Sequence, residues 1–228
     1  MIFPPFLYRG DADLQNSRQL RQWRRGHLLT NMSNGGSGRE IFSVPITDLI
    51  RRHVDTGWEK THFLSFTESY ARAEYFAGVT DISDYHITDR NDWDAAIVTI
   101  DTSCFRLEET YESGVYRCHY DLKPDVHCRQ NLNDVLAYYI PRQVASAYRQ
   151  HKPVSVLVIN LVSFLSDHQA QGISGVEVSL IKAIRDREWL ILPLYPAVGI
   201  PGEYTAALDI SCISKFECFK WGSVVSGT

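Results

Sequence analysis

The chain has 228 residues, of which 44% are hydrophobic and 22% are charged, enough to bury a full core as one large domain or two small ones. The net charge of -4 and the pI near 6.1 argue against a basic surface devoted to nucleic acid. Five cysteines without a CxxC pair indicate a reduced compartment, and the longest apolar run is too short to span a bilayer, so we expect a soluble protein with no membrane partner.

The N-terminal part of the chain is predicted to contain one strand and two helices. Phe6–Asp11 has the composition of a first strand, which breaks at Gly10. Residues 14–26 have helical spacing of their apolar side chains, and residues 31–39 are rich in Gly, Asn and Ser, which indicates a loop. A second helix is predicted over residues 47–54.

Residues 62–77 are predicted to form one unit, a strand that runs into a helix. Apolar Leu64 and Phe66 alternate with two hydroxyl residues, as in a half-buried strand. Thr67 is then expected to cap the helix with its hydroxyl, and Gly78 to end it. Such a strand presents its hydroxyls to a ligand from a rigid position.

The middle of the chain is predicted to hold a buried strand followed by an insertion. Ala95–Asp101 is mostly apolar and has the composition of a buried strand. Residues 104–170 are expected to be an inserted, partly helical element, in which residues 131–150 have helical spacing around a proline. Residues 154–165 fit a buried strand followed by a helical turn, and their periodicity alone does not decide between strand and helix.

Three further strands are predicted near the C-terminus. Residues 176–180 alternate between apolar and polar side chains, and residues 188–192 form an apolar run that ends at a proline. Phe216, Phe219 and Trp221 mark a last strand. Because strands and helices do not alternate regularly, the sequence predicts an α+β fold rather than a doubly wound sheet.

Three short motifs occur in order along these elements. An arginine ends the first strand in Tyr8-Arg9-Gly10, the strand Ser65-Phe66-Thr67 runs into a helix that contains AEYFA, and a late strand begins with Asp186-Arg187-Glu188. In this order the motifs resemble the Arg/Ser-Thr-Ser/Glu class of mono-ADP-ribosyltransferases, which includes the cholera- and pertussis-type toxins and the pierisin-like enzymes. The resemblance implies a single domain with a split β-sheet core and flanking helices, NAD as the substrate, and a toxin or effector role.

The resemblance also implies a role for each matched residue in binding NAD. Arg9, with Gly10 beside it, would bind the pyrophosphate or the neighbouring ribose through its planar fork of donors. Ser65 would bond the ribose on the nicotinamide side and orient the glutamate, and Thr67 would support the bend from strand to helix. Phe66 and Tyr70 are expected to stack on the nicotinamide ring, because an aromatic face binds a flat heterocycle without polar cost.

Glu188 is the residue on which the chemistry is expected to depend. Cleavage of the bond between nicotinamide and ribose builds positive charge on the sugar, and a carboxylate bonded to the 2'-hydroxyl stabilises that charge as it develops. Asp186 stands where the family usually has Glu or Gln, a position that helps to select the acceptor, and it would orient or deprotonate the acceptor. A second acidic group, Glu108, Glu109 and Glu112, is the alternative to Glu188, but no apolar strand ending in proline follows it.

The resemblance therefore implies a mono-ADP-ribosyltransferase that transfers ADP-ribose from NAD to a macromolecular acceptor, either protein or nucleic acid. It would act in the cytoplasm or after delivery into the cytoplasm of a target cell. NAD glycohydrolysis, with water as the acceptor, is one alternative. The other is an inert binding module, which the Phe6 to Gly10 segment suggests through its similarity to domains named for a Phe-Arg-Gly motif. We expect no metal, because the Cys118-His119 and His127-Cys128 pairs lack a usual zinc spacing.

Overall fold

The computed structural model describes residues 2–11, 27–29, 45–56, 63–78, 95–121, 154–193, 207–209 and 213–219. These ranges form an α+β fold in which one large antiparallel sheet carries helices. This confirms the predicted fold class. None of the helices within these ranges is long and apolar enough to cross a membrane.

The main sheet has eight strands in the order β10-β4-β1-β3-β8-β7-β6-β5, and every neighbouring pair is antiparallel. The strand bounds are β1 Phe6–Asp11, β3 Leu64–Thr67, β4 Ala95–Asp101, β5 Arg106–Glu112, β6 Val115–Tyr120, β7 Val154–Asn160, β8 Glu188–Pro193 and β10 Ile213–Phe219. A separate two-stranded sheet pairs β2 (His27–Leu29) with β9 (Ala207–Asp209). The predicted strands at 6–11, 95–101 and 188–192 are confirmed, and the last strand is confirmed over Phe216 and Phe219.

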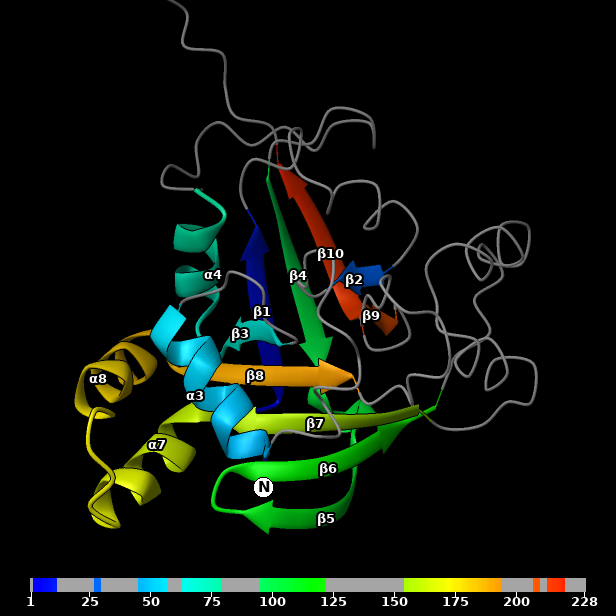
Figure 1. The fold of residues 1–228 in the computed structure, drawn as a ribbon. Helices are drawn as coiled ribbons and strands as arrows, with labels where there is room; N and C mark the ends of the chain where they lie inside the picture. Colours follow the sequence, from blue (N-terminus) through cyan, green and yellow to red (C-terminus); the bar gives the residue numbers. More distant parts are fainter. Residues whose placement is uncertain are drawn as a thin grey trace, which may run out of the picture.

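The main sheet consists of two groups of strands that run in different directions. In Figure 1, β10, β4 and β1 stand upright, whereas β8, β7, β6 and β5 run across the view, with the short β3 between the groups. We call them the β1 half (β10, β4 and β1) and the β8 half (β3 and β8 to β5). The register joins β1 to β3 at one pair, Tyr8 with Thr67, whereas β3 pairs with β8 along its whole length. The two halves therefore meet at the narrow β1–β3 contact.

Helices cover the two halves unequally. The bounds are α3 Ile46–Thr56, α4 Tyr70–Phe76, α7 Leu161–Ala170 and α8 Glu177–Asp186. In Figure 1, α4 stands beside β1, while α3 crosses β8 and β7, and α7 and α8 lie at one end of the same strands. The predicted helix at 47–54 is confirmed as part of α3, and residues 154–165 form a strand and then a helix.

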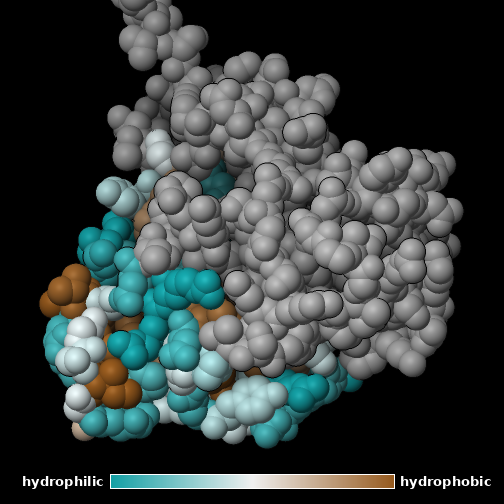
Figure 2. Space-filling view, in the orientation of Figure 1, coloured by the Kyte–Doolittle hydropathy of each residue, from teal (hydrophilic) through white to brown (hydrophobic). Residues whose placement is uncertain are grey.

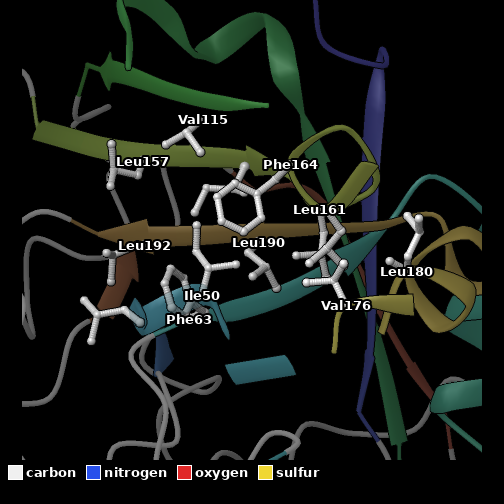
Figure 3. Close-up of a cluster of buried hydrophobic side chains, with 14 residues drawn as sticks. Ile50, Phe63, Val115, Leu157, Leu161, Phe164, Val176, Leu180, Leu190 and Leu192 are labelled. Atoms are coloured by element: carbon white, nitrogen blue, oxygen red, sulfur yellow. The ribbon is translucent and has the colours of Figure 1, made fainter. Parts of the chain in front are cut away.

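The core follows this division. In the β8 half, 14 buried side chains from α3, α7, α8 and the strands beneath them form one apolar cluster, which includes Ile50, Phe164 and Leu190 (Figure 3). In the β1 half the described cluster is smaller, and it joins Ala73 and Ala77 of α4 to strand β4. There α4 approaches β1 so closely that a Cβ on Gly10 would overlap the carbonyl oxygen of Ala73. Gly10 is therefore a packing requirement.

The strand predicted at 176–180 is wrong, because these residues belong to helix α8. Only Leu180 and Ala183 of its apolar residues turn inward, whereas Val178 and Ile181 are 66% and 67% exposed. Figure 2 shows apolar side chains on the surface on the side where Figure 1 places α8. The alternation of apolar and polar residues suggested a strand. It arises because some apolar residues of α8, such as Val178, are exposed to solvent and do not follow the helical burial pattern.

Two other predictions need correction. Ser69, not Thr67, caps α4, because its side-chain oxygen accepts a hydrogen bond from the backbone N–H of Arg72. The described parts of residues 104–170 are also not a separate helical element, since they supply β5, β6 and β7 of the main sheet together with α7. The elements predicted at 14–26, 31–39 and 131–150 and the residue Trp221 lie outside the described residues.

Candidate functional site

Three of the predicted site residues come together because β1, β3 and β8 are neighbours in the sheet. β1 carries Arg9, β3 carries Ser65 and β8 begins with Glu188. Ser65 lies opposite Leu190 in the register, and Glu188 precedes Leu190 by two positions, so both side chains lie on the same face. Tyr8 lies opposite Thr67, so the side chain of Arg9 leaves β1 on the other face and reaches the seam between the two halves at the backbone carbonyl of Ser65.

Arg9 is fixed by contacts on two of its edges. Its Nε and NH2 groups donate to the two oxygens of Asp11 at 3.0 Å and 2.8 Å, and its NH1 donates to the backbone carbonyl of Ser65 at 3.1 Å. The guanidinium has five N–H donors, so these three bonds leave donors for an anion. The side chains of Arg9 and Asp11 are each 15% exposed, so the pair is mostly buried.

Burial of Asp11 disfavours the negative charge that pairs with Arg9. Burial raises the pKa of Asp11 above the ordinary value, and the charge and hydrogen bonds of Arg9 offset only part of this effect. The carboxylate is therefore held in place at an electrostatic cost. Its contact with Arg9 fixes the plane of the guanidinium beside Ser65.

His53 lies between Ser65 and Glu188. Its Nε2 lies 3.1 Å from the hydroxyl oxygen of Ser65 and 3.9 Å from a carboxylate oxygen of Glu188. The imidazole is 5% exposed and packs edge-on against Phe63, whereas the Glu188 side chain is 22% exposed. A buried imidazole thus holds the inner side of the site, while the carboxylate reaches the surface.

The sequence analysis did not single out His53. A signal for it existed in the helix periodicity. Leu49, Ile50 and His53 fall on one face of α3, and all three are buried. A histidine on the apolar stripe of an amphipathic helix must find a polar partner in the core, and here it finds the hydroxyl of Ser65.

Asp186 does not join this group. Its carboxylate accepts hydrogen bonds from Arg72 at 2.7 Å and from Arg185 at 2.8 Å, and its side chain is 11% exposed. Burial alone would raise the pKa of Asp186, but the hydrogen bonds and charges of the two arginines outweigh it and lower the pKa. A carboxylate that is held ionised by two arginines is a poor base, so the predicted role in deprotonating an acceptor does not fit its surroundings.

Four other predicted NAD contacts have structural roles. Phe66 is 2% exposed and part of the core, so it offers no free face to a nicotinamide ring. Thr67 is also 2% exposed, and its hydroxyl donates to the backbone carbonyl of Asp186 at 2.6 Å. Gly10 accommodates α4, as described above. Tyr70 is half-buried; it packs edge-on against Tyr8, and its hydroxyl donates to a carboxylate oxygen of Glu217.

The alternative acidic group lies elsewhere on the sheet. Glu108, Glu109 and Glu112 belong to β5, which β6 and β7 separate from β8. Glu108 contacts Arg117 at 3.1 Å and His119 at 3.0 Å rather than any of the three residues at the seam. The geometry therefore favours Glu188 over this group.

The chain matches no known protein family, and neither its sequence nor its fold matches a characterised protein or a solved structure. The chemistry of the site must therefore be argued from its own residues. Together, Arg9, His53, Ser65 and Glu188 offer donors for an anion, a hydroxyl held by an imidazole, and a surface carboxylate. This combination suits a ligand that carries both phosphate and a polyhydroxylated ring.

Proposed function

We propose that the protein is a mono-ADP-ribosyltransferase that cleaves the bond between nicotinamide and ribose in NAD and transfers ADP-ribose to a macromolecular acceptor. The observation that supports this most is the meeting of Arg9, Ser65 and Glu188 on three adjacent strands, with His53 linking the last two. The same three residues stand in the three sequence motifs that resemble the family.

In the proposed reaction, the free donors of Arg9 bind the diphosphate of NAD. Asp11 and the carbonyl of Ser65 hold the guanidinium before the ligand arrives, so little rotational freedom is lost on binding. The diphosphate then fixes the attached nicotinamide riboside over the seam, towards Glu188.

Glu188 provides the main stabilisation of the transition state. Its carboxylate accepts a hydrogen bond from a ribose hydroxyl, and this interaction strengthens as the sugar becomes an oxocarbenium-like cation and nicotinamide leaves with the bonding electron pair. His53 and Ser65 fix the carboxylate and the sugar relative to each other, because the imidazole contacts both side chains. The nucleophile of the acceptor then forms the new bond at the anomeric carbon.

Hydrolysis of NAD is the second candidate function, and one observation favours it. The carboxylate nearest to Glu188 in sequence, Asp186, is already bonded to Arg72 and Arg185 and is poorly suited to activate a protein or nucleic-acid acceptor. Water needs no docking site and is the simplest acceptor in that case.

The test uses NAD labelled in the nicotinamide ring or, in a parallel sample, in the adenine ring. Release of labelled nicotinamide, together with adenine label on macromolecules of a cell lysate, is the expected result. Free ADP-ribose alone would indicate hydrolysis. If NAD neither is cleaved nor raises the melting temperature, the proposal is wrong and an inert module is favoured, because a ligand that binds only the folded state must stabilise it.

A further inference from the structure

We propose that Arg72 and Asp186 are positioning residues, whose ion pair ties the turn before α4 to the turn before β8 and so sets the place of Glu188. The proposal rests on the proposed function, because it assigns the pair a role in NAD cleavage. We call residues 67–72, which run from the end of β3 into the start of α4, the first turn. Residues 185–189, which run from the end of α8 into the start of β8, are called the second turn. The two turns are far apart in sequence and adjacent in space.

Four hydrogen bonds cross between the two turns. Arg72 Nε donates to Asp186 at 2.7 Å, and the Thr67 hydroxyl donates to the Asp186 carbonyl at 2.6 Å. The backbone N–H of Glu68 donates to the Arg187 carbonyl at 3.3 Å. The Trp189 indole N–H donates to the Glu68 carboxylate at 2.6 Å. These bonds hold the residues that come immediately before and after Glu188 in the chain.

The second turn needs such support because its backbone is unfavourable. Arg187 has φ 47° and ψ 52°, the left-handed conformation, and it is the one non-glycine residue with a positive φ in the part of the chain that the structure describes. This conformation is unfavourable for a residue with a Cβ, which comes too close to the following carbonyl oxygen. Glu188 follows immediately, so a relaxation of this turn would rotate its carboxylate away from His53.

Arg72 is suited to hold the turn because its own position is fixed. Its guanidinium lies 4.1 Å from the centre of the Tyr75 ring and 4.8 Å from that of Phe76, both on the same helix. The side chains of Arg72 and Asp186 are 20% and 11% exposed, so water screens their attraction less than at an open surface. The pair thus connects α4 rigidly to the end of α8.

Arg185 provides a matched control for the charge. It also bonds Asp186, through Nε and NH2 at 2.8 Å each, but both residues belong to α8 and the arginine side chain is 60% exposed. Its loss removes a cation from the same carboxylate without releasing one turn from the other. A charge effect and a positioning effect are therefore separable.

The experiment compares Arg72→Gln, Arg185→Gln and Asp186→Asn with the parent protein, all assayed well below the lowest melting temperature. For Arg72→Gln and Asp186→Asn we expect kcat for nicotinamide release to fall about tenfold to a hundredfold, because small misplacements of a catalytic group have effects of this size, while KM for NAD changes less than about twofold. Arg185→Gln should keep kcat within about twofold. The double variant of Arg72 and Asp186 should be no slower than either single variant, since both remove one interaction.

A second measurement is independent of activity. The NMR signal of the Trp189 indole N–H, assigned by its loss in Trp189→Phe, reports on the bond between Glu68 and the second turn. It should shift in Arg72→Gln and stay in place in Arg185→Gln. Arg72→Lys, which keeps the charge, should lie between the parent and Arg72→Gln in kcat, and it serves as the test if Arg72→Gln does not fold.

The outcomes separate this inference from the proposed function. A parent protein that does not cleave NAD overturns the function, and the positioning of the second turn is then judged by the indole signal alone. Parental kcat with an unmoved indole signal in Arg72→Gln overturns the positioning role. Equal losses of kcat in Arg72→Gln and Arg185→Gln would also overturn it, because the effect would then be one of charge.

Discussion

The two halves of the main sheet achieve their packing in different ways. The β8 half is held by a large cluster of Leu, Ile, Phe and Val side chains under three helices. The β1 half instead brings a helix backbone against a strand backbone, through Ala73, Ala77 and Gly10. Large side chains tolerate small shifts by repacking, whereas backbone contacts do not, so the difference predicts that the β1 half is less tolerant of added atoms.

The candidate site depends on both halves. Arg9 comes from the β1 half, and His53, Ser65 and Glu188 come from the β8 half. The halves meet at the short β1–β3 contact, where Arg9 bonds the carbonyl of Ser65. In the proposed mechanism, binding of the diphosphate and stabilisation of the ribose would therefore belong to separate structural units. Variants in each half should change different kinetic parameters.

The largest effect is expected in the β8 half, for Glu188→Gln. This change removes the negative charge that stabilises the developing cation, and we expect kcat for nicotinamide release to fall about 10²- to 10³-fold. KM for NAD and the melting temperature should stay close to the parent values. Glu109→Gln, on the exposed strand β5, makes the same chemical change away from the site and is the control. Equal rates for the two variants would remove Glu188 from the mechanism.

The next effect concerns the packing of the β1 half. In Gly10→Ala the new methyl group would overlap the Ala73 carbonyl and lie 2.8 Å from the backbone nitrogen of Ala77. Because backbone cannot move aside as a side chain does, we expect the free energy of unfolding to fall by about 3 kcal/mol, measured by urea denaturation. Gly172→Ala, whose Cβ would meet nothing within 4 Å, carries only the cost of its φ of +77° and should lose about 1 kcal/mol. If Gly10→Ala lost no more free energy of unfolding than Gly172→Ala, the close contact between Gly10 and Ala73 would be contradicted.

A smaller effect is expected for Arg9→Lys, which tests the binding role of the β1 half. Lysine keeps the charge but lacks the planar fork that bonds Asp11 and the Ser65 carbonyl at the same time. We expect the Kd for NAD, measured by calorimetry, to rise about tenfold, with kcat nearly unchanged. Arg106→Lys, whose side chain is 65% exposed on β5, is the matched control. A loss confined to kcat would place Arg9 in the chemical step instead.

The smallest effect is the dependence of stability on pH, which should differ in sign between the halves. The folded-state pKa of Asp186 is lowered, so its contribution to stability is present above its unfolded value near 3.8 and is lost as the pH falls through the folded pKa. The folded-state pKa of Asp11 is raised, so its contribution is present below the unfolded value and is lost as the pH rises through the folded pKa.

Urea midpoints between pH 3 and pH 7 measure this difference. Relative to the parent protein, Asp186→Asn should become less destabilising as the pH falls. Asp11→Asn should become more favourable as the pH rises. Parallel curves for the two variants would show that the two carboxylates have similar surroundings.

The sequence predicted those parts of the fold where the local pattern matches the burial pattern. Ala95–Asp101 is mostly apolar, and its first six residues are buried on both faces of the sheet, as expected. β5 was not predicted, because Arg106–Glu112 is a mostly exposed strand without apolar alternation. α8 was misassigned because exposed Val178 and buried Leu180 look equivalent in a sequence, although only tertiary packing decides which of them faces the core.

The candidate site could be predicted as a set of residues but not as a network. Motif order identified Arg9, Ser65 and Glu188, and the sheet brings them together. The contact between Asp186 and Arg72 could not be predicted, because Arg72 lies on helix α4 and no local spacing in the sequence connects the two residues. The distinction between a free carboxylate and one held by arginines exists only in three dimensions, and it changes the role assigned to Asp186.

Strand β5 has a further consequence for how the protein behaves at high concentration. Among the strands that the structure describes, it is the outermost on its side of the sheet. It carries Glu108, Glu109 and Glu112, and its pairing with β6 is irregular at two places. A regular outer strand offers unpaired backbone groups to any neighbouring molecule, which is a common route to aggregation. Here the acidic side chains of two approaching copies would repel each other, and the irregular backbone would misalign their hydrogen bonds. We therefore expect these two features to hinder growth of the sheet into a fibre at high protein concentration.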